Sequence, residues 1–154
     1  MTSAGGTTTT LRPIVVGVDG SQSSLAALRW GVRQAKLTGA PLDIVSAWEW
    51  PTSYLGWGTP PVPPDYDPAD EARRQLDKAV SAVLTPGDAI EARQSVIEGH
   101  PAPVLEGLSK TADLVVVGSQ GHGEFAGMLL GSVSQHCVTH CRCPVAVIRG
   151  TPGA

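Results

Sequence analysis

Two segments rich in glycine and serine hold the residues whose types and spacing could do chemistry. The first, GVDGS at residues 17–21, ends an apolar run. The second, GSQG at residues 118–121, ends another apolar run and continues to Gly131 and Ser132. Glycine lets a backbone approach a ligand closely, and a helix start offers N–H groups and partial positive charge to a phosphate. The two segments therefore favour binding of a phosphate-bearing ligand.

The second segment differs from the common phosphate loops. It contains no GxxxxGK[ST] motif, and no GxGxxG follows the first apolar run. No Lys or Arg lies between Gly118 and Gln135, so phosphoryl transfer would lack its usual charge stabilisation. This composition predicts binding rather than hydrolysis. The role of Asp19 stays open between a residue of the site and a cap at the entry of the next helix.

A cluster of histidines and cysteines at residues 136–141 suggests zinc at first sight. His136 and His140 are four residues apart, and so are Cys137 and Cys141. The two pairs point about 100° apart on one helix, so four side chains cannot converge on one tetrahedral ion. We expect Cys137 and Cys141 to be small core residues, and the three cysteines do not indicate a disulfide framework.

The elements that must position these segments alternate between strands and helices. Strands are expected at residues 14–18, 42–48, 90–97, 114–117 and 144–149, and helices at about 21–37, 69–83, 101–108 and 131–140. The runs at 14–18 and 114–117 are apolar on both faces, as in a parallel sheet covered by helices. Residues 90–97 begin with alternation of Ile90 and Ala92 with Glu91 and Arg93, which predicts a half-exposed strand at a sheet edge. The pattern predicts an α/β, doubly wound domain.

Capping signals mark several of these ends. Ser21 or Ser23 is suited to cap the first helix, and Gly39 to end it. Residues 49–68 hold six prolines and most of the aromatic residues, so regular structure is not expected there. Trp48, Trp50, Tyr54 and Trp57 could form a wall over a nucleotide base. A proline-rich loop folded over the sheet edge is the favoured interpretation.

Composition narrows the class of protein. The chain has 154 residues, which suits one domain, with 42% hydrophobic and 16% charged residues. A net charge of −3 argues against a general nucleic-acid binder. No apolar run approaches the ~20 residues of a membrane span. We expect a disordered tail at residues 1–11, a domain at 12–150, a short tail at 151–154 and a cytoplasmic location.

The order of these motifs resembles the universal stress protein family. The glycine spacing at 118, 121 and 131, followed by Ser132, is similar to the ATP-binding signature of that family. IVVGVDGS at residues 14–21 resembles its first strand and turn, and CPVAVIR at 143–149 its last strand. Gly99-His100-Pro101 stands where the family has Gly-x-Pro before its third helix. The resemblance covers about residues 12–149.

The resemblance implies a five-stranded parallel sheet in the order 3-2-1-4-5 and an ATP site. Adenine would lie against main chain at Val18 and Ala47. Asp19 would lie near the ribose, the phosphates or a magnesium ion. The residues that would line the ribose and phosphates are Val117, Gly118, Gln120, Gly121, Gly131, Ser132 and Val133. Where ATP-binding relatives often have His, this chain has Gln120. The loop residue His122 could approach a terminal phosphate. The alternative, equally favoured, is an exposed loop histidine that does not bind the ligand.

The family also implies a homodimer formed by the last strand. Val145–Ile148 would be an apolar edge strand, which is an aggregation liability unless it is paired. We expect a non-enzymatic, ATP-binding stress-response protein that acts as a regulatory switch, with magnesium bound beside the ATP. A cAMP sensor, a slow ATPase with Asp19 holding magnesium, and a dimerisation module without nucleotide are the alternatives.

Overall fold

Five parallel strands form one sheet in the order β3-β2-β1-β4-β5, as expected. The computed structural model describes residues 11–50, 63–121 and 130–150. Three residues discussed above, Tyr54, Trp57 and His122, lie outside these residues. The expected terminal tails also lie outside them, except for residue 11. The strands are β1 (Ile14–Gly17), β2 (Leu42–Trp48), β3 (Ala92–Glu98), β4 (Leu114–Gly118) and β5 (Val145–Ile148).

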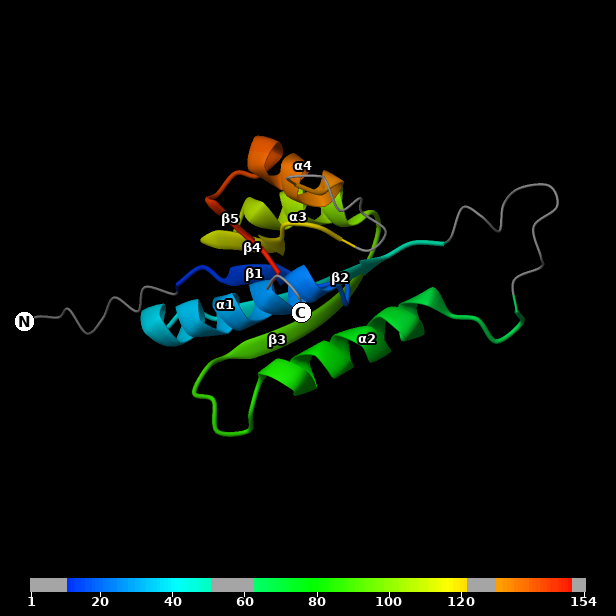
Figure 1. Cartoon of the computed structure of the whole chain (residues 1–154), viewed down its shortest axis with the longest axis horizontal. Coiled ribbons are helices and arrows are strands. Elements are labelled where there is room, and N and C mark those ends of the chain that lie inside the picture. Colours follow the sequence, from blue (N-terminus) through cyan, green and yellow to red (C-terminus); the bar gives the residue numbers. More distant parts are fainter. Residues whose placement is uncertain (1–10, 51–62, 122–129, 151–154) are drawn as a thin grey trace, which may run out of the picture.

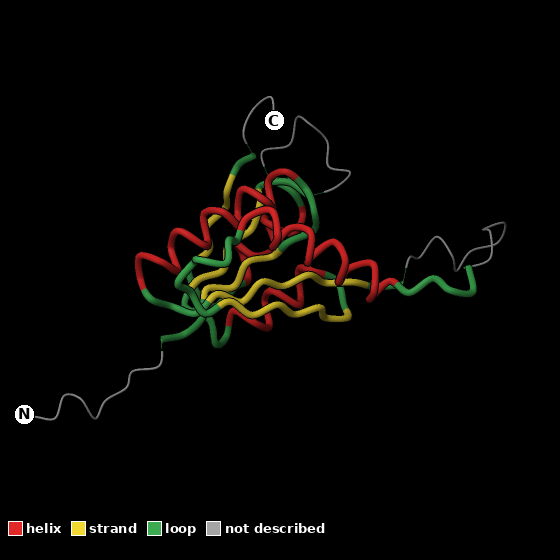
Figure 2. Tube along the Cα trace, turned by 90° about the horizontal axis from the view of Figure 1, so that it is seen from below, coloured by secondary structure: helices red, strands yellow, loops and turns green. Residues whose placement is uncertain are grey.

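Helices cover both faces of this sheet, which makes the fold a doubly wound α/β domain (Figure 1). One face carries α1 (Gln22–Thr38) and α2 (Pro68–Val83), and the other carries α3 (Pro101–Ser109) and α4 (Ser132–His140). Figure 2 shows the strands side by side with helices above and below them. In the described part of the chain, no helix is both long and apolar enough to cross a membrane.

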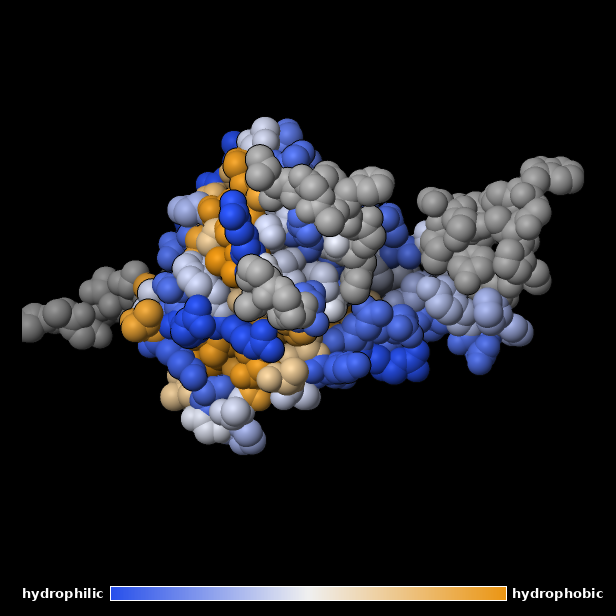
Figure 3. All heavy atoms as spheres, in the orientation of Figure 1, coloured by the Kyte–Doolittle hydropathy of each residue, from blue (hydrophilic) through white to orange (hydrophobic). Residues whose placement is uncertain are grey.

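β1 is apolar on both faces, which explains its position at the centre of the sheet. Val16 contacts the core under α1 and α2, whereas Val15 contacts the core under α3 and α4. Both side chains are fully buried. The outer face of α2 is hydrophilic, as its blue surface in Figure 3 shows. Alternating residues of one strand thus join two hydrophobic cores, which fixes the strand that leads into the first glycine-containing segment.

The helix ends follow the capping residues of the sequence. Ser21, rather than Ser23, is the N-cap of α1, and its side chain accepts a hydrogen bond from Ser24 N. Gly39 ends α1 with a positive φ of 78°, a conformation that glycine adopts without strain. Asp67 caps α2 by accepting hydrogen bonds from the N–H groups of its first turn. These caps set where each helix starts relative to the carboxyl edge of the sheet.

The strand at the sheet edge differs from its expected pattern. The predicted edge position is confirmed, but β3 begins at Ala92, two residues later than expected. Ala92 is exposed, and the strand as a whole is half-exposed, as predicted for a sheet edge. Ile90 lies before the strand and packs partly against the core. The edge has only β2 as a neighbour, and the first three residues of β3 remain open to solvent.

Candidate functional site

A pocket of about 590 Å³, partly open to solvent, lies at the carboxyl ends of β1 and β4. These two strands are neighbours in the sheet, yet the chain proceeds in opposite directions from them, to β2 and β3 on one side and to β5 on the other. Such a reversal of strand order opens a crevice where open α/β sheets bind ligands. The topology therefore places the pocket where ligand binding is expected.

The pocket brings together nine of the ten residues that the sequence singled out. Val18 and Asp19 follow β1, and Ala47 comes from β2. The other six are Val117, Gly118, Gln120, Gly121, Gly131 and Val133. Ser132 is the exception, because it is the first residue of α4 and its side chain is exposed. One turn of helix directs Val133 and Ser134 to the pocket instead.

Sequence reasoning missed part of the pocket wall. The lining residues that it did not single out are Ser24, Val45, Pro101, Val104 and Leu105, whereas Gly17 and Ser21 belong to the first glycine-containing segment and Ser134 was a candidate hydroxyl donor. Val104 and Leu105 belong to α3, which returns over the carboxyl edge after β3. The spacing of these apolar residues in the sequence predicts the buried face of a helix, but it does not indicate contact with a ligand. The Gly-His-Pro start of α3 was the available clue, since it places that helix at the same edge.

The wall of the pocket is mostly apolar, with polar groups gathered near the glycine-containing segments. Val45, Ala47, Leu105 and Val117 supply apolar surface from three elements. Gln120 and Ser134 supply polar groups beside the backbone of Gly118. Asp19 is the single charged residue among the lining residues that the structure describes. The arrangement suits a flat apolar group at one end and hydrogen-bonding groups at the other.

Gly118 lets two chain segments meet at the pocket floor. A Cβ atom at this position would lie 2.6 Å from the carbonyl carbon of Ser23 and 2.7 Å from Ser24 N. The Ser23 hydroxyl also makes a short hydrogen bond to the carbonyl oxygen of Gln120 and accepts one from Gln120 N at 3.3 Å. The start of α1 and the residues after β4 are thereby held together without an intervening side chain.

The start of α4 is tied to the same residues. Gly131 is its N-cap and supplies no capping side chain. Gly131 N donates to the Ser119 carbonyl at 2.6 Å, and the Ser134 hydroxyl donates to the carbonyls of Gly131 and Ser119 at 2.9 and 3.2 Å. These bonds fix the two ends of the segment that joins β4 to α4. They also direct the helix N-terminus, with its partial positive charge, at the pocket.

The surroundings of Asp19 leave both interpretations of this residue open, although the N-cap of α1 itself is Ser21. Its Oδ1 accepts a hydrogen bond from Ser21 N at 2.9 Å, which shapes the turn into α1. The same residue is exposed and lines the pocket. One carboxylate oxygen thus supports the turn, while its charge faces the space where a ligand would lie.

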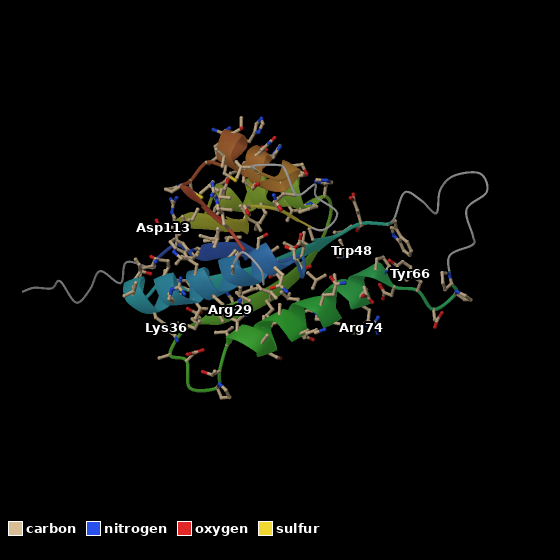
Figure 4. All side chains as sticks on the ribbon, viewed as in Figure 1. Arg29, Lys36, Trp48, Tyr66, Arg74 and Asp113 are labelled. Carbon is tan, nitrogen blue, oxygen red and sulfur yellow. The ribbon has the colours of Figure 1, made fainter. Side chains whose placement is uncertain are left out.

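Trp48, Trp50 and Tyr66, at and after the carboxyl end of β2, lie outside the pocket lining. Trp48 and Trp50 make an edge-to-face contact with ring centroids 6.4 Å apart, and Trp50 and Tyr66 make another at 6.3 Å. Figure 4 shows Trp48 and Tyr66 at the same end of the molecule. Neither lines the pocket. The proline-rich loop lies mostly outside the described residues, so its place over the sheet edge stays a prediction.

The cysteines of α4 belong to the core, as expected. Cys137 is fully buried, and Cys141 packs partly against the same hydrophobic cluster. Burial raises the pKa of the Cys137 thiol to about 12, with a further contribution from Cys141. A thiol with so high a pKa is almost wholly protonated at neutral pH and is a poor nucleophile.

Comparison with known proteins decides the family. The model of the universal stress protein family matches residues 10–149. The chain belongs to this family. A universal stress protein of Mycobacterium tuberculosis H37Rv, Rv2624c, is 36% identical over 141 residues, which cover 91% of this chain and 49% of the relative. The chain spans about half the length of the curated relatives it matches.

Solved universal stress proteins share the fold. One, described as a complex with cAMP, is 27% identical, with a TM-score of 0.59 and coverage of 93% of this chain and all of that chain. UspA from Lactobacillus plantarum is 25% identical, with a TM-score of 0.65 and coverage of 90% and 97%. The protein MJ0577 is only 14% identical, but its TM-score of 0.72 over 94% and 99% of the two chains shows the same fold.

Proposed function

We propose that this universal stress protein domain binds an adenine nucleotide in the pocket between β1 and β4, and that occupancy acts as a regulatory switch without catalysis. The observation that carries the proposal is the two-part lining: apolar surface from β2, β4 and α3 beside glycine backbone and the uncapped start of α4. Apolar surface suits a purine, and the helix start suits phosphate.

ATP with magnesium is the first candidate ligand. Among the described lining residues there is no Lys, Arg or His, and Asp19 adds a negative charge. A divalent cation would resolve this conflict, because magnesium typically binds one or two carboxylates together with substrate phosphates. An exposed carboxylate with one oxygen used in the turn fits such a ligand, so Asp19 is the residue that would hold the ion. When bound, magnesium would supply charge neutralisation for the phosphates.

The lack of Lys, Arg and His among the described lining residues also supports regulation rather than turnover. Fast phosphoryl transfer uses cationic side chains near the transferred group, as well as a residue that positions the nucleophile. The pocket lining that the structure describes offers backbone, hydroxyls, Gln120 and one carboxylate. A slow ATPase would appear as phosphate release that Asp19→Asn abolishes.

A cAMP sensor is the second candidate, and the charge of the pocket favours it. Cyclic AMP carries far less negative charge than ATP and needs no metal, which suits a lining without cationic side chains. The solved relative with 27% identity is described as a cAMP complex. Both candidates use the same apolar surface and differ at the phosphate end.

Calorimetric titration of ligand-free protein tests the proposal. ATP with magnesium, ATP with chelator and cAMP are each titrated into the native chain, Asp19→Asn and Ala47→Leu. Asp113→Asn is the matched control, since this exposed carboxylate precedes β4 at the opposite end of the strand (Figure 4). Ala47→Leu should abolish all nucleotide binding by filling the pocket.

The Asp19 variant separates the two ligands. If ATP binds with magnesium, Asp19→Asn should weaken it at least about tenfold, as loss of a metal ligand does. If cAMP is the ligand, removing the negative charge of Asp19 should leave the affinity for cAMP unchanged or increase it. No heat with any of these nucleotides, in protein shown to be ligand-free, would refute nucleotide binding.

A homodimer through β5 is part of the proposal. This strand forms one edge of the sheet, and its four residues are only partly buried. The carbonyls of Pro144 and Ile148 accept hydrogen bonds from β4, so the amides of Val145 and Val147 face the open edge. Val147→Pro removes one of these donors, whereas Val147→Ala only trims the side chain. Light scattering should show a dimer for the native chain and Val147→Ala, and a monomer for Val147→Pro.

A further inference from the structure

A second chemical cluster lies away from the nucleotide pocket, where α3 packs against α4. Glu106 belongs to α3, and His136 and His140 belong to α4. One potential ligand atom from each residue lies within 4.8 Å of the others. Sequence reasoning excluded convergence of the four His and Cys residues of α4. It did not consider a carboxylate from a neighbouring helix, which only the packing of α3 against α4 supplies.

The geometry of the cluster is close to that of a metal centre. His136 Nε2 and Glu106 Oε1 are 2.7 Å apart. The rings of His136 and His140, one helical turn apart, stack at 4.3 Å between centroids with an interplanar angle of 24°. Ligand atoms that share a tetrahedral ion at about 2.1 Å lie about 3.4 Å from each other. Small rotations of these side chains therefore suffice for three of them to reach one ion.

The hydrogen bond to His140 leaves one of its two ring nitrogens able to bind a metal ion. Its Nδ1 lies 3.2 Å from the carbonyl oxygen of His136. A carbonyl only accepts, so Nδ1 carries the proton and Nε2 of the neutral ring keeps its lone pair. A backbone carbonyl that orients the second ring nitrogen is the usual support of a metal-binding histidine. His136 must transfer or release its Nε2 proton before this atom can bind an ion.

Exposure and charge also suit a metal ion. The Glu106 and His136 side chains are 36% and 31% exposed, and His140 is exposed. An ion could therefore enter from solvent and keep water as a further ligand. The Glu106 carboxylate places a negative charge 2.7 Å from the His136 ring. Lys110 is the nearby cation that opposes binding.

We propose that Glu106, His136 and His140 form a surface site for a divalent transition-metal ion of the zinc class. Two imidazoles and one carboxylate are a common zinc ligand set when the fourth position is left to water. The ion would connect α3 to α4 through side chains of both helices. The inference does not rest on the proposed nucleotide function, because these three residues are absent from the pocket lining.

Titration of tag-free, reduced protein with Zn²⁺ in the absence of nucleotide tests the site. We expect one ion per chain, and at least about tenfold weaker binding in Glu106→Gln, His136→Gln and His140→Gln. Glu91→Gln is the matched control, because Glu91 is an exposed carboxylate that precedes the edge strand β3 and belongs to neither α3 nor α4. His140 is exposed, so His140→Gln should remain folded, and circular dichroism checks this for each variant.

The cysteines provide the decisive control, since thiolates are strong zinc ligands. Cys141→Ser and Cys143→Ser should bind Zn²⁺ as the native chain does. Co²⁺ in place of Zn²⁺ should show visible bands of nitrogen and oxygen ligation without a thiolate charge-transfer band. The proposal is overturned if the native chain binds no Zn²⁺, if the three Gln variants bind it unchanged, or if the thiolate band appears.

Discussion

A methyl group added at Gly118 tests how the pocket floor is built. In Gly118→Ala the new Cβ would lie 2.6 Å from the carbonyl carbon of Ser23, whereas ordinary contacts begin at 3.4 Å. The difference, 3.4 − 2.6, means that the start of α1 must move by about 0.8 Å. Overpacking of this kind costs about 1–3 kcal/mol. Because the obstacle is backbone rather than a flexible side chain, we expect a loss of about 2 kcal/mol.

Gly107→Ala is the matched control for this substitution. Gly107 lies within α3, is exposed, and has nothing within 4 Å of an added Cβ. Alanine there should stabilise the protein by about 0.5–1 kcal/mol through helix propensity. Urea unfolding followed by circular dichroism gives both free energies, and calorimetry compares nucleotide affinity. The reasoning is refuted if Gly118→Ala unfolds at the native urea concentration, or if both variants change stability in the same direction.

Three further predictions concern stability and reactivity. The Lys36 ammonium, and then the Thr85 N–H, lower the pKa of Asp88. The ionised carboxylate should therefore stabilise the protein above its unfolded pKa of about 3.9, and this effect should be lost as pH falls through the lower folded pKa. In urea titrations, Asp88→Asn should be less stable than the native chain at pH 7, and the difference should shrink as the pH is lowered below the unfolded pKa. Cys137, with its raised pKa and full burial, should resist a thiol reagent until the protein unfolds, and mass spectrometry showing equal labelling of all cysteines in native buffer would contradict this. Loss of the N-cap in Asp67→Ala should reduce the free energy of unfolding by about 1 kcal/mol, and an unchanged value would show that α2 starts without it.

Local signals in the sequence predicted most of the fold. The continuous apolar character of residues 14–17 required a strand buried on both faces, and β1 is the centre of the sheet. Gly39 and the serine before α1 marked helix ends because their chemistry acts over a few residues. The start of β3 was misplaced because alternation at Ile90 and Ala92 does not reveal how far the edge is covered.

The candidate site was predictable where backbone chemistry marks it. Gly118 and Gly131 stand out in the sequence, and they are the residues at a close approach of two chain segments and at the start of α4. Leu105 does not stand out, since it is a core residue of α3 by spacing and reaches the pocket only through the return of that helix. The Glu106–His136 pair is hidden for the same reason, as its partners are 30 residues apart and meet only when α3 packs against α4.

The measurement that tests the central proposal most directly is a two-dimensional amide NMR titration of the ligand-free, isotope-labelled chain with ATP and magnesium, and then with cAMP. The account predicts shifts confined to the pocket, at Val18, Ala47, Gly118, Gly121 and the first turn of α4. Amides of β3 and the distal end of α2 should stay unchanged. Shifts centred elsewhere, or no shifts at millimolar nucleotide, would contradict the assignment of this pocket as the binding site.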